Sequence, residues 1–341
     1  MIRLKDLAAA VGVSASAVSL VLNDRHEGRV NSRTAERIRA AAVEMGYIPN
    51  QLARGLKTKR THTIGVLSDR VASVPFAGRM LEGVQTVAWE AGYLAMIIDT
   101  TDRPELVDQA SRSLLQRDID AMIVAADFHR RVEVPSVPPT IPLVVLDGVP
   151  SEGGRADGVV PDEVAGAHAA TTHLLESGHR RIAFCNIGGD QYIASRLRYD
   201  GYARAMTEHG AGLDKRRVLT LEDPGTSTAY APLLALLSSP DRPTAVFCFS
   251  DQIAFAAYQA AGDLGLRIPE DLSVVGFDDQ RFIADALRPA LTTVRLPHYE
   301  MGAWAAKRVI DRMQEESPSP PVVERISCPL VVRESVGPPP E

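Results

Sequence analysis

Residues 12–23 read GVSASAVSLVLN, and this stretch has the form of a turn followed by a short helix. The apolar residues just before it recur at helical spacing: Leu4, Leu7, Ala8 and Val11. This spacing predicts a short amphipathic helix that ends at Gly12, because glycine readily stops a helix. Ser14 is suited to cap a second helix that runs to about Leu22, since its hydroxyl can accept a hydrogen bond from a free amide of the first turn.

The second predicted helix has two different sides. At about 100° per residue, the side that packs is formed by Ala17, Val18, Val21 and Leu22. The outward side is formed by Ala15, Ser16, Ser19 and Leu20. A third helix is predicted from Asn31 or Ser32 to Gly46, with an inner side made of Ile38, Ala41, Ala42 and Met45. Three short helices within residues 1–48 predict an all-α helix-turn-helix DNA-binding domain.

Charge is distributed unevenly along the chain. The whole sequence carries a formal charge of −6, yet residues 1–60 hold eleven Lys or Arg against five acids, a balance of +6, so the remainder carries −12. A basic head on an acidic body is typical of a protein whose head alone meets a polyanion. An ordinary solvated helical surface would give the same balance, so the helical spacing decides the interpretation.

Residues 49–60 predict a short hinge helix and linker. The segment begins with a proline that breaks the chain and an asparagine suited to cap a helix, and Leu52 and Leu56 then lie one helical turn apart. A helix of this length with Gly55 inside it is marginal alone. We expect it to need a partner in order to fold.

Residues 61–335 predict two α/β lobes with a site for a small-molecule effector. Helical stretches such as 79–91 and 162–177 alternate with short apolar segments: TIGVLSD, LAMIIDT, DAMIVAA, PLVVLDG, RIAFCN, TAVFCFS and LSVVGFDD. Apolar strands separated by helices are typical of parallel sheets that are covered on both faces. Such sheets place ligands at the carboxyl ends of their strands, and the cleft between two lobes is a natural site.

Composition and length exclude several classes of protein. With 341 residues, 45% of them apolar, the chain can bury a large core. No window approaches the roughly 18 unbroken apolar residues of a membrane span, and Lys5 and Asp6 stand where a signal peptide needs an apolar region. A cytoplasmic protein without membrane association is therefore expected. The cysteines lie far apart in apolar segments and are interpreted as buried, unreactive thiols: Cys185, Cys248 and Cys328.

The motifs of the common enzyme classes are missing from the sequence. GxGxxG, GxxxxGK[ST], GxSxG and HExxH do not occur. His168 and His173 are separated by about 140° around a helix, which is too far for them to share a metal. Gly188 and Gly189 follow a predicted strand, where a plain turn explains them better than a phosphate site. We expect no catalytic residue, no bound metal and no cofactor.

Six ordered blocks resemble the lactose-repressor/galactose-repressor (LacI-GalR) family of transcription factors. They span nearly the whole chain: RLKDLAAAVGVSASAVSLVLN, EMGYIPNQLARGLKTKRTHTIGVL, HLLESGHRRIAF, SRLRYDGYARAM, FSDQIAFAAYQAAGDLGLRIPEDLSVVGFDD and PALTTVRLP. The resemblance implies a periplasmic-binding-protein-like fold in which the chain crosses three times between lobes. We place the N-lobe at about 61–160 and 290–321, and the C-lobe at about 161–289 and 322–335. Residues 336–341 form a flexible tail in this interpretation.

The resemblance also implies which residues meet DNA. Base edges would be approached from the outward side of the second helix by Ala15, Ser16 and Leu20. These side chains offer apolar contacts or single hydrogen bonds, so direct readout of the bases should be modest. Phosphate contacts are expected from Ser14, Ser19, Asn23, Asn31 and Thr34. The minor-groove wedge of the family falls on Leu56, with Ala53 and Lys57 beside it, and two such wedges in a dimer kink the duplex.

The effector cleft implied by the resemblance uses polar residues at strand ends or helix starts: Asp147, Arg198, Ser250 and Asp278. Carboxylates accept hydrogen bonds and a guanidinium donates them, so this set suits the hydroxyls of a sugar. Phe76 and Tyr192 correspond to aromatic positions near the cleft, although packing in the core explains them equally well. Asp251 and Asp279 are instead expected to cap helices or turns.

Together these observations predict a DNA-binding transcriptional regulator, a repressor, that binds a pseudo-palindromic double-stranded operator as a homodimer. A small molecule, a sugar or sugar derivative, would control it allosterically. We favour a dimer over a tetramer because no leucine heptad follows residue 335. Two alternatives stay open: a stand-alone periplasmic-type binding protein, which leaves residues 1–60 unexplained, and a family member that senses a nucleobase or nucleoside.

Overall fold

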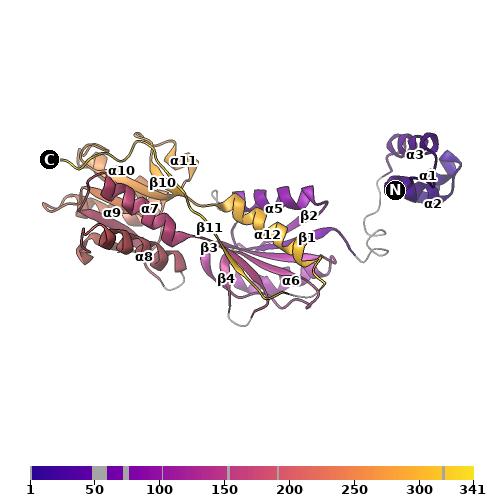
Figure 1. The fold of residues 1–341 in the computed structure, drawn as a ribbon, viewed down its shortest axis with the longest axis horizontal. Coiled ribbons are helices and arrows are strands. Elements are labelled where there is room, and N and C mark those ends of the chain that lie inside the picture. The colour runs from indigo at the N-terminus through magenta and orange to yellow at the C-terminus, as the bar shows by residue number, and fades with distance from the viewer. Residues whose placement is uncertain are drawn as a thin grey trace. The chain divides into compact units, whose positions relative to one another are not determined.

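The computed structural model describes residues 2–47, 60–71, 77–101, 103–151, 154–189, 192–316 and 319–341. The chain divides into two compact units, Met1–Thr61 and His62–Glu341, each of which is described by itself (Figure 1). The expected hinge helix lies outside the described residues. The same holds for four side chains assigned above to DNA or effector: Ala53, Leu56, Lys57 and Phe76.

Within residues 2–47 the first unit holds three helices: α1 (Leu4–Val11), α2 (Ala15–Leu22) and α3 (Ser32–Glu44). Gly12 ends α1 at a φ of 72°, in the left-handed region that glycine favours. The Ser14 hydroxyl caps α2 by accepting a hydrogen bond from the amide of Ala17 at 3.1 Å, as expected. The helices enclose a small apolar core that includes Leu7, Val18 and Ile38. The predicted helix-turn-helix fold is confirmed.

The first lobe of the second unit is built on a six-stranded parallel sheet. Its strands are ordered β11 (Val323–Ile326), β5 (Asp157–Pro161), β4 (Leu143–Pro150), β3 (Ala121–Val132), β1 (Thr63–Ser68) and β2 (Leu94–Asp99). Helices α5 (Gly78–Glu90) and α12 (His298–Arg312) cover one face, and α6 (Val107–Leu115), preceded by the short turn η1 (Pro104–Leu106), covers the other (Figure 1).

The second lobe repeats this plan. Its strands are ordered β12 (Leu330–Val331), β10 (Thr292–Arg295), β9 (Ser273–Asp278), β8 (Ala245–Cys248), β6 (Ile182–Ile187) and β7 (Val218–Leu221), and β12 alone runs antiparallel among the described strands. One face packs on α7 (Glu163–Glu176) and α8 (Ile193–Glu208), and the other on α9 (Thr226–Leu237) and α10 (Asp251–Asp263). The short elements η2 (Lys215–Arg217) and α11 (Arg281–Ala284) complete the lobe.

The chain crosses between the two sheets after β5, after β10 and after β11. The crossings expected at 289 and 321 were placed too early. Residues 292–295 pair with β9 in the second sheet, because Thr293 lies in register with Gly276. Residues 323–326 pair with β5 in the first sheet, and their largely exposed side chains give little apolar signal in the sequence.

The flexible tail expected at 336–341 is also corrected. Gly337 donates its amide to Ser273 Oγ at 3.1 Å, and its carbonyl accepts from His179 Nε2 at 2.9 Å. Both partners are buried in the second lobe. The proline-rich composition suggested a flexible segment, but these bonds hold the backbone of Gly337 to the lobe.

All three cysteines are buried and free, as predicted. Among the residues that the structure describes, no single helix is long and apolar enough to cross a membrane.

Helices α5 and α12 pack closely through two glycines. A methyl group on Gly83 would overlap the backbone carbonyl oxygen of Tyr299, and one on Gly302 would overlap that of Met80. We predict that Gly83→Ala lowers the free energy of unfolding of the second unit by about 1–3 kcal/mol, because backbone cannot move aside as a flexible side chain would. Urea denaturation measures this change.

The matched control is Gly262→Ala. Gly262 also lies in a helix, α10, but no atom stands within 4 Å of an added methyl group. This substitution should be neutral or stabilise by about 0.5–1 kcal/mol through helix propensity. Equal denaturation midpoints for the two variants would contradict the close packing of α5 on α12.

Candidate functional site

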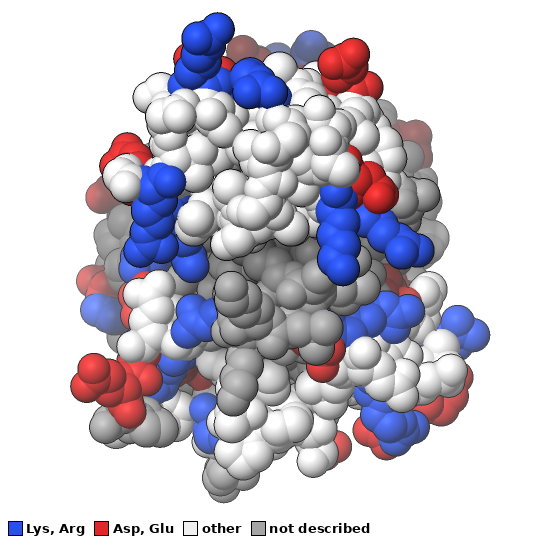
Figure 2. All heavy atoms as spheres, turned by 90° about the vertical axis from the view of Figure 1, so that its right-hand side faces the viewer, with Lys and Arg blue, Asp and Glu red and all other residues white. Residues whose placement is uncertain are grey.

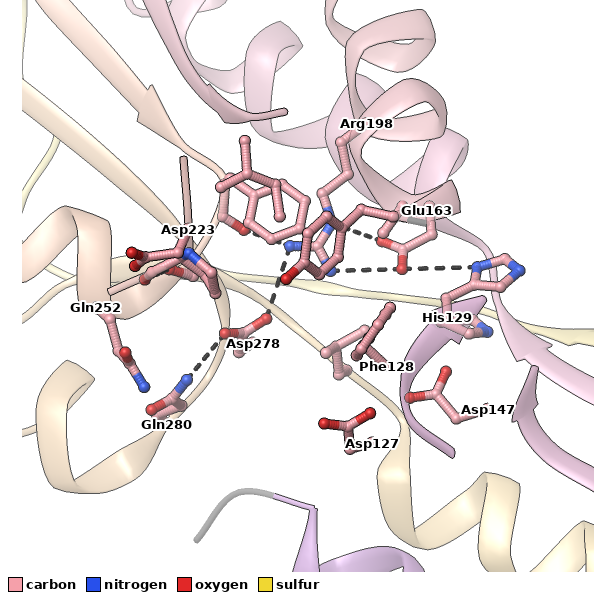
Figure 3. Close-up of a pocket in the computed structure, with 18 of the residues that line it drawn as sticks. Asp127, Phe128, His129, Asp147, Glu163, Arg198, Asp223, Gln252, Asp278 and Gln280 are labelled. Carbon is pink, nitrogen blue, oxygen red and sulfur yellow. Dashed lines mark hydrogen bonds and ion pairs between the residues drawn. The ribbon is translucent and has the colours of Figure 1, made fainter. Parts of the chain in front are cut away.

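A cavity of about 410 Å³ lies between the two lobes of the second unit (Figure 3). Side chains from the first lobe enter it from β3, β4 and the start of α12, namely Asp127, Phe128, His129, Asp147 and His298. The second lobe contributes residues from α7, α8, β9 and the start of α10. This position at the strand ends of two parallel sheets is where α/β proteins bind ligands.

Five of the six residues expected in an effector cleft line this one cavity: Asp147, Tyr192, Arg198, Ser250 and Asp278. The sixth, Phe76, lies outside the described residues. The five come from chain segments up to 131 positions apart, so the fold gathers residues that the sequence keeps separate.

Arg198 is the central cation of the cavity. Its Nε donates to Glu163 Oε2 at 2.7 Å and its Nη1 donates to the Phe249 carbonyl. The same Nη1 lies 3.7 Å from Asp278 Oδ1, and the guanidinium carbon stands 3.6 Å from the centre of the Phe277 ring. Burial alone would lower the pKa of Arg198, but Glu163 and Asp278 raise it, so the group stays charged.

Glu163 is the buried counter-ion of Arg198. Burial alone would raise the pKa of this carboxyl, but Arg198 and His129 hold its pKa below the ordinary value. His129 Nδ1 lies 3.8 Å from Glu163 Oε1, and only 4% of the His129 side chain is exposed. Since His129 belongs to β3 and Glu163 begins α7, the ion pair of the second lobe touches the first lobe here (Figure 3).

Two further carboxyl groups have unusual environments. Burial raises the pKa of Asp278 to about 7 despite the opposing charge of Arg198. Asp278 also accepts a hydrogen bond from Gln280 Nε2 at 2.9 Å. Burial, with Glu163 and Asp127 nearby, raises the pKa of Asp147 well above its usual range. Asp147 is 3% exposed and its Oδ1 has no hydrogen-bond partner.

Ser250 has a structural task in addition to lining the cavity. Its hydroxyl caps α10 by accepting from the amide of Ile253 at 3.2 Å. Asp251, expected at a cap or turn, fixes the turn after β9, because it accepts from the Gln280 amide and from Thr293 Oγ1, each at 2.6 Å. Asp279 pairs with Arg333 at 2.7 Å. Neither of these two carboxyls is among the residues that line the cavity.

Two family profiles match the chain. The profile described as "Bacterial regulatory proteins, lacI family" matches residues 3–50, and the "Periplasmic binding protein-like domain" matches residues 171–336. The ribose operon repressor of Escherichia coli (strain K12) is 33% identical over 318 residues, which cover 92% of this chain and 94% of that protein. The chain belongs to the lacI family. It is therefore a DNA-binding transcriptional repressor with a small-molecule effector, not an enzyme.

Other members of the lacI family are similarly related. The HTH-type transcriptional repressor PurR of Vibrio vulnificus (strain CMCP6) is 32% identical over 338 residues, covering 98% of this chain and 99% of the relative. A crystal structure of a LacI family transcriptional regulator from Enterococcus faecium with bound ribose matches with a TM-score of 0.65 at 25% identity. It covers 81% of this chain and 99% of that one.

The lacI-family head presents helix α2 with no charged side chain on it. Ser16 is exposed, and Ala15, Ser19 and Leu20 are half-buried, so all four reach the surface. Exposed cations come from other positions: Arg3, Lys5, Arg25, Arg29, Arg33, Arg37 and Arg39. Figure 2 shows Lys and Arg groups in blue beside white regions without charge.

Several polar groups assigned to phosphate contacts also serve the head itself. Ser14 and Asn31 cap α2 and α3, with Asn31 Oδ1 accepting from the Thr34 amide at 2.8 Å. Asn23 donates from its side chain to the Ser19 carbonyl at 2.7 Å. Ser14 and Asn31 lie at helix N-termini, where phosphate binding is common, whereas Asn23 lies at the C-terminal end of α2.

Sequence reasoning missed Glu163, His129, Asp127, Gln280 and His298. The sequence does hold one signal for Glu163, because it falls at helical spacing with the buried residues Gly166 and Ala170, on the apolar side of α7. A charged residue on an apolar side needs a buried partner. Its partner, Arg198, lies on α8, and no local sequence pattern predicts that α8 packs against α7.

The raised pKa of Asp278 predicts a specific dependence of stability on pH. Because the folded state holds this proton more tightly than the unfolded chain does, the contribution of Asp278 to the unfolding free energy falls as pH rises from about 4 to about 7. The unfolding free energy of the parent chain minus that of Asp278→Asn should decrease over this interval. Calorimetry at several pH values checks it, and a difference that grows with pH would contradict the assignment.

Proposed function

We propose that the effector of this repressor is a sugar or sugar derivative that binds in the cavity between the lobes. The observation that supports this most is the set of acidic, basic and polar groups at the strand ends of both sheets, centred on Arg198, Asp278 and Asp147. Sugar hydroxyls both donate and accept, so they match carboxylates and a guanidinium approaching from several directions. Phe128 and Tyr192, with ring centres 4.8 Å apart, offer an apolar wall.

A ligand that contacts both lobes would favour one arrangement of them over another. The change would reach DNA through residues 49–60, which join the two units of the chain. Because α2 offers no bidentate hydrogen-bonding side chain, part of the operator preference is assigned to a sequence-dependent kink at the minor groove, made by Leu56 of each subunit.

A second copy of the chain is proposed to dock along the edge of the first sheet. The edge strand β2 exposes Leu94 (54%) and Ile97 (39%), and α5 beside it exposes Trp89 (73%). Large apolar side chains on an edge strand are typical of surfaces that another chain covers. A two-fold dimer formed there would present two heads to a pseudo-palindromic operator.

The effector prediction is tested by a thermal-shift screen against sugars, sugar phosphates and purines. A sugar-like compound should raise the melting temperature, and Arg198→Lys should abolish the shift because lysine cannot reproduce the forked contacts. Arg204→Lys is the control, since Arg204 lies on the same helix with its side chain 65% exposed. A response confined to purines would replace the sugar with a nucleobase, and binding unaffected by Arg198→Lys would place the ligand elsewhere.

The wedge prediction concerns Leu56. Leu56→Ala should weaken operator binding by about tenfold or more and reduce DNA bending, because the kinked step loses its inserted side chain. A gel-shift assay with circularly permuted operator fragments measures both quantities. Leu213→Ala, at a side chain in the second lobe that is 45% exposed, is the control. Unchanged DNA bending by Leu56→Ala would show that Leu56 is not the minor-groove wedge.

The docking prediction concerns Leu94. Leu94→Asp should shift the chain from dimer to monomer in light scattering and weaken operator binding, since a buried charge at the interface has no partner. Leu213→Asp introduces the same change at another exposed leucine and should leave the dimer intact. A dimer that survives Leu94→Asp would place the interface on a different surface.

A further inference from the structure

The lining of the cavity between the lobes holds more acidic residues than arginines. Its described lining includes five acids, Asp127, Asp147, Glu163, Asp223 and Asp278, against two arginines, Arg70 and Arg198. His298 adds no positive charge near neutral pH, because burial lowers its pKa to about 4. A cationic ligand would favour the ionised form of these buried carboxyl groups, whereas a neutral ligand would not.

The neighbouring cations already have carboxylate partners. Arg198 binds Glu163 and lies beside Asp278. Arg70, whose side chain is 47% exposed, lies 3.2 Å from Asp127. Arg130 on β3 does not line this cavity; it pairs with Asp69, and the charge of Asp147 also acts on it. These pairs account for Asp127, Glu163 and Asp278. They include neither Asp147 nor Asp223, and Asp223 accepts hydrogen bonds from the Gly225 amide and from Thr228 Oγ1.

Asp147 is thus the exception among the buried acids of the cavity. Its side chain is almost fully buried, yet Oδ1 accepts no hydrogen bond. Figure 3 shows Asp147 and Asp127 together on one side of the cavity, while the dashed contacts run through Arg198, Glu163, His129, Asp278 and Gln280. Buried carboxylates are normally paired or hydrogen-bonded. Asp147 Oδ1 is therefore available to accept a hydrogen bond from a bound ligand.

We propose that the effector carries a protonated amine that binds Asp147, which makes it an amine-bearing polyol such as an amino sugar. This inference rests on the proposed function, because it assigns the chemical class of the ligand in the same cavity. An ammonium group donates up to three hydrogen bonds and would place a cation in direct contact with Asp147. The rings of Phe128 and Tyr192 stand in the same cavity and add a surface that attracts cations.

The hydroxyls of such a ligand have partners on the opposite side of the cavity. Asp278 and Gln280 come from the end of β9 and the turn after it, in the second lobe. The ammonium would contact the first lobe through β4, so one small molecule would join both lobes. Burial and neighbouring carboxyls raise the pKa of Asp147 despite the opposing charge of Arg198, so a bound ammonium group would shift this carboxyl toward its ionised form.

A matched pair of small probes tests the charge directly. Tris and pentaerythritol are compact polyols that differ by an ammonium group in place of one hydroxymethyl arm. Calorimetric titration of the full chain at pH 7, at constant ionic strength, should give binding of Tris about tenfold tighter or more than that of pentaerythritol. Asp147→Asn should abolish the difference. Asparagine suits the φ of 58° at this position, so the variant is expected to fold.

The control variant is Asp200→Asn, which removes one carboxylate from α8, where the side chain is 50% exposed. It should leave the preference for Tris unchanged. Equal affinities for the two probes, no binding of Tris, or a preference that survives Asp147→Asn would overturn the inference. If neutral sugars bind in an Arg198-dependent way while Tris does not, the proposed function stands and only the amine is wrong. If no sugar, amine or purine binds, both fail.

Discussion

The buried guanidinium of Arg198 is the interaction on which the effector cavity depends. It holds Glu163 at the first residue of α7 and lies beside Asp278 at the last residue of β9, so it fixes the relative positions of α7, α8 and β9. Removing one partner of such a pair leaves an uncompensated buried charge, which typically costs about 3–5 kcal/mol. The same guanidinium is the donor that a polar ligand meets on the second lobe.

The lobes share this charged centre as well as three chain crossings. His129 from β3 stands 3.8 Å from Glu163, and His298 begins α12 directly after the crossing that follows β10. A ligand that satisfies Asp147 in the first lobe and Asp278 in the second would therefore act on both sheets at once. In the lacI family the output of such a change is DNA binding, and the basic residues of positions 1–60 provide the surface on which it acts.

The sequence alone was sufficient for the helix-turn-helix, because apolar spacing, Gly12 and Ser14 are local signals. It also indicated Asp147, Arg198 and Asp278, since they lie in recognisable blocks at strand or helix ends. Glu163, His129 and Asp127 were missed because their roles come from long-range contacts. The exposed strand β11 and the hydrogen-bonded end at Gly337 were misjudged for a similar reason: neighbours distant in sequence determine them, whereas their composition suggests a loop.

The most direct test of the account is reciprocal coupling between ligand and operator. Operator affinity is measured by fluorescence anisotropy with and without a saturating cavity ligand, and ligand affinity is measured with and without operator. The account predicts that operator affinity changes by about fivefold or more and that ligand affinity changes by the same factor, as linkage requires. Operator affinity that stays the same when the cavity is filled would contradict it.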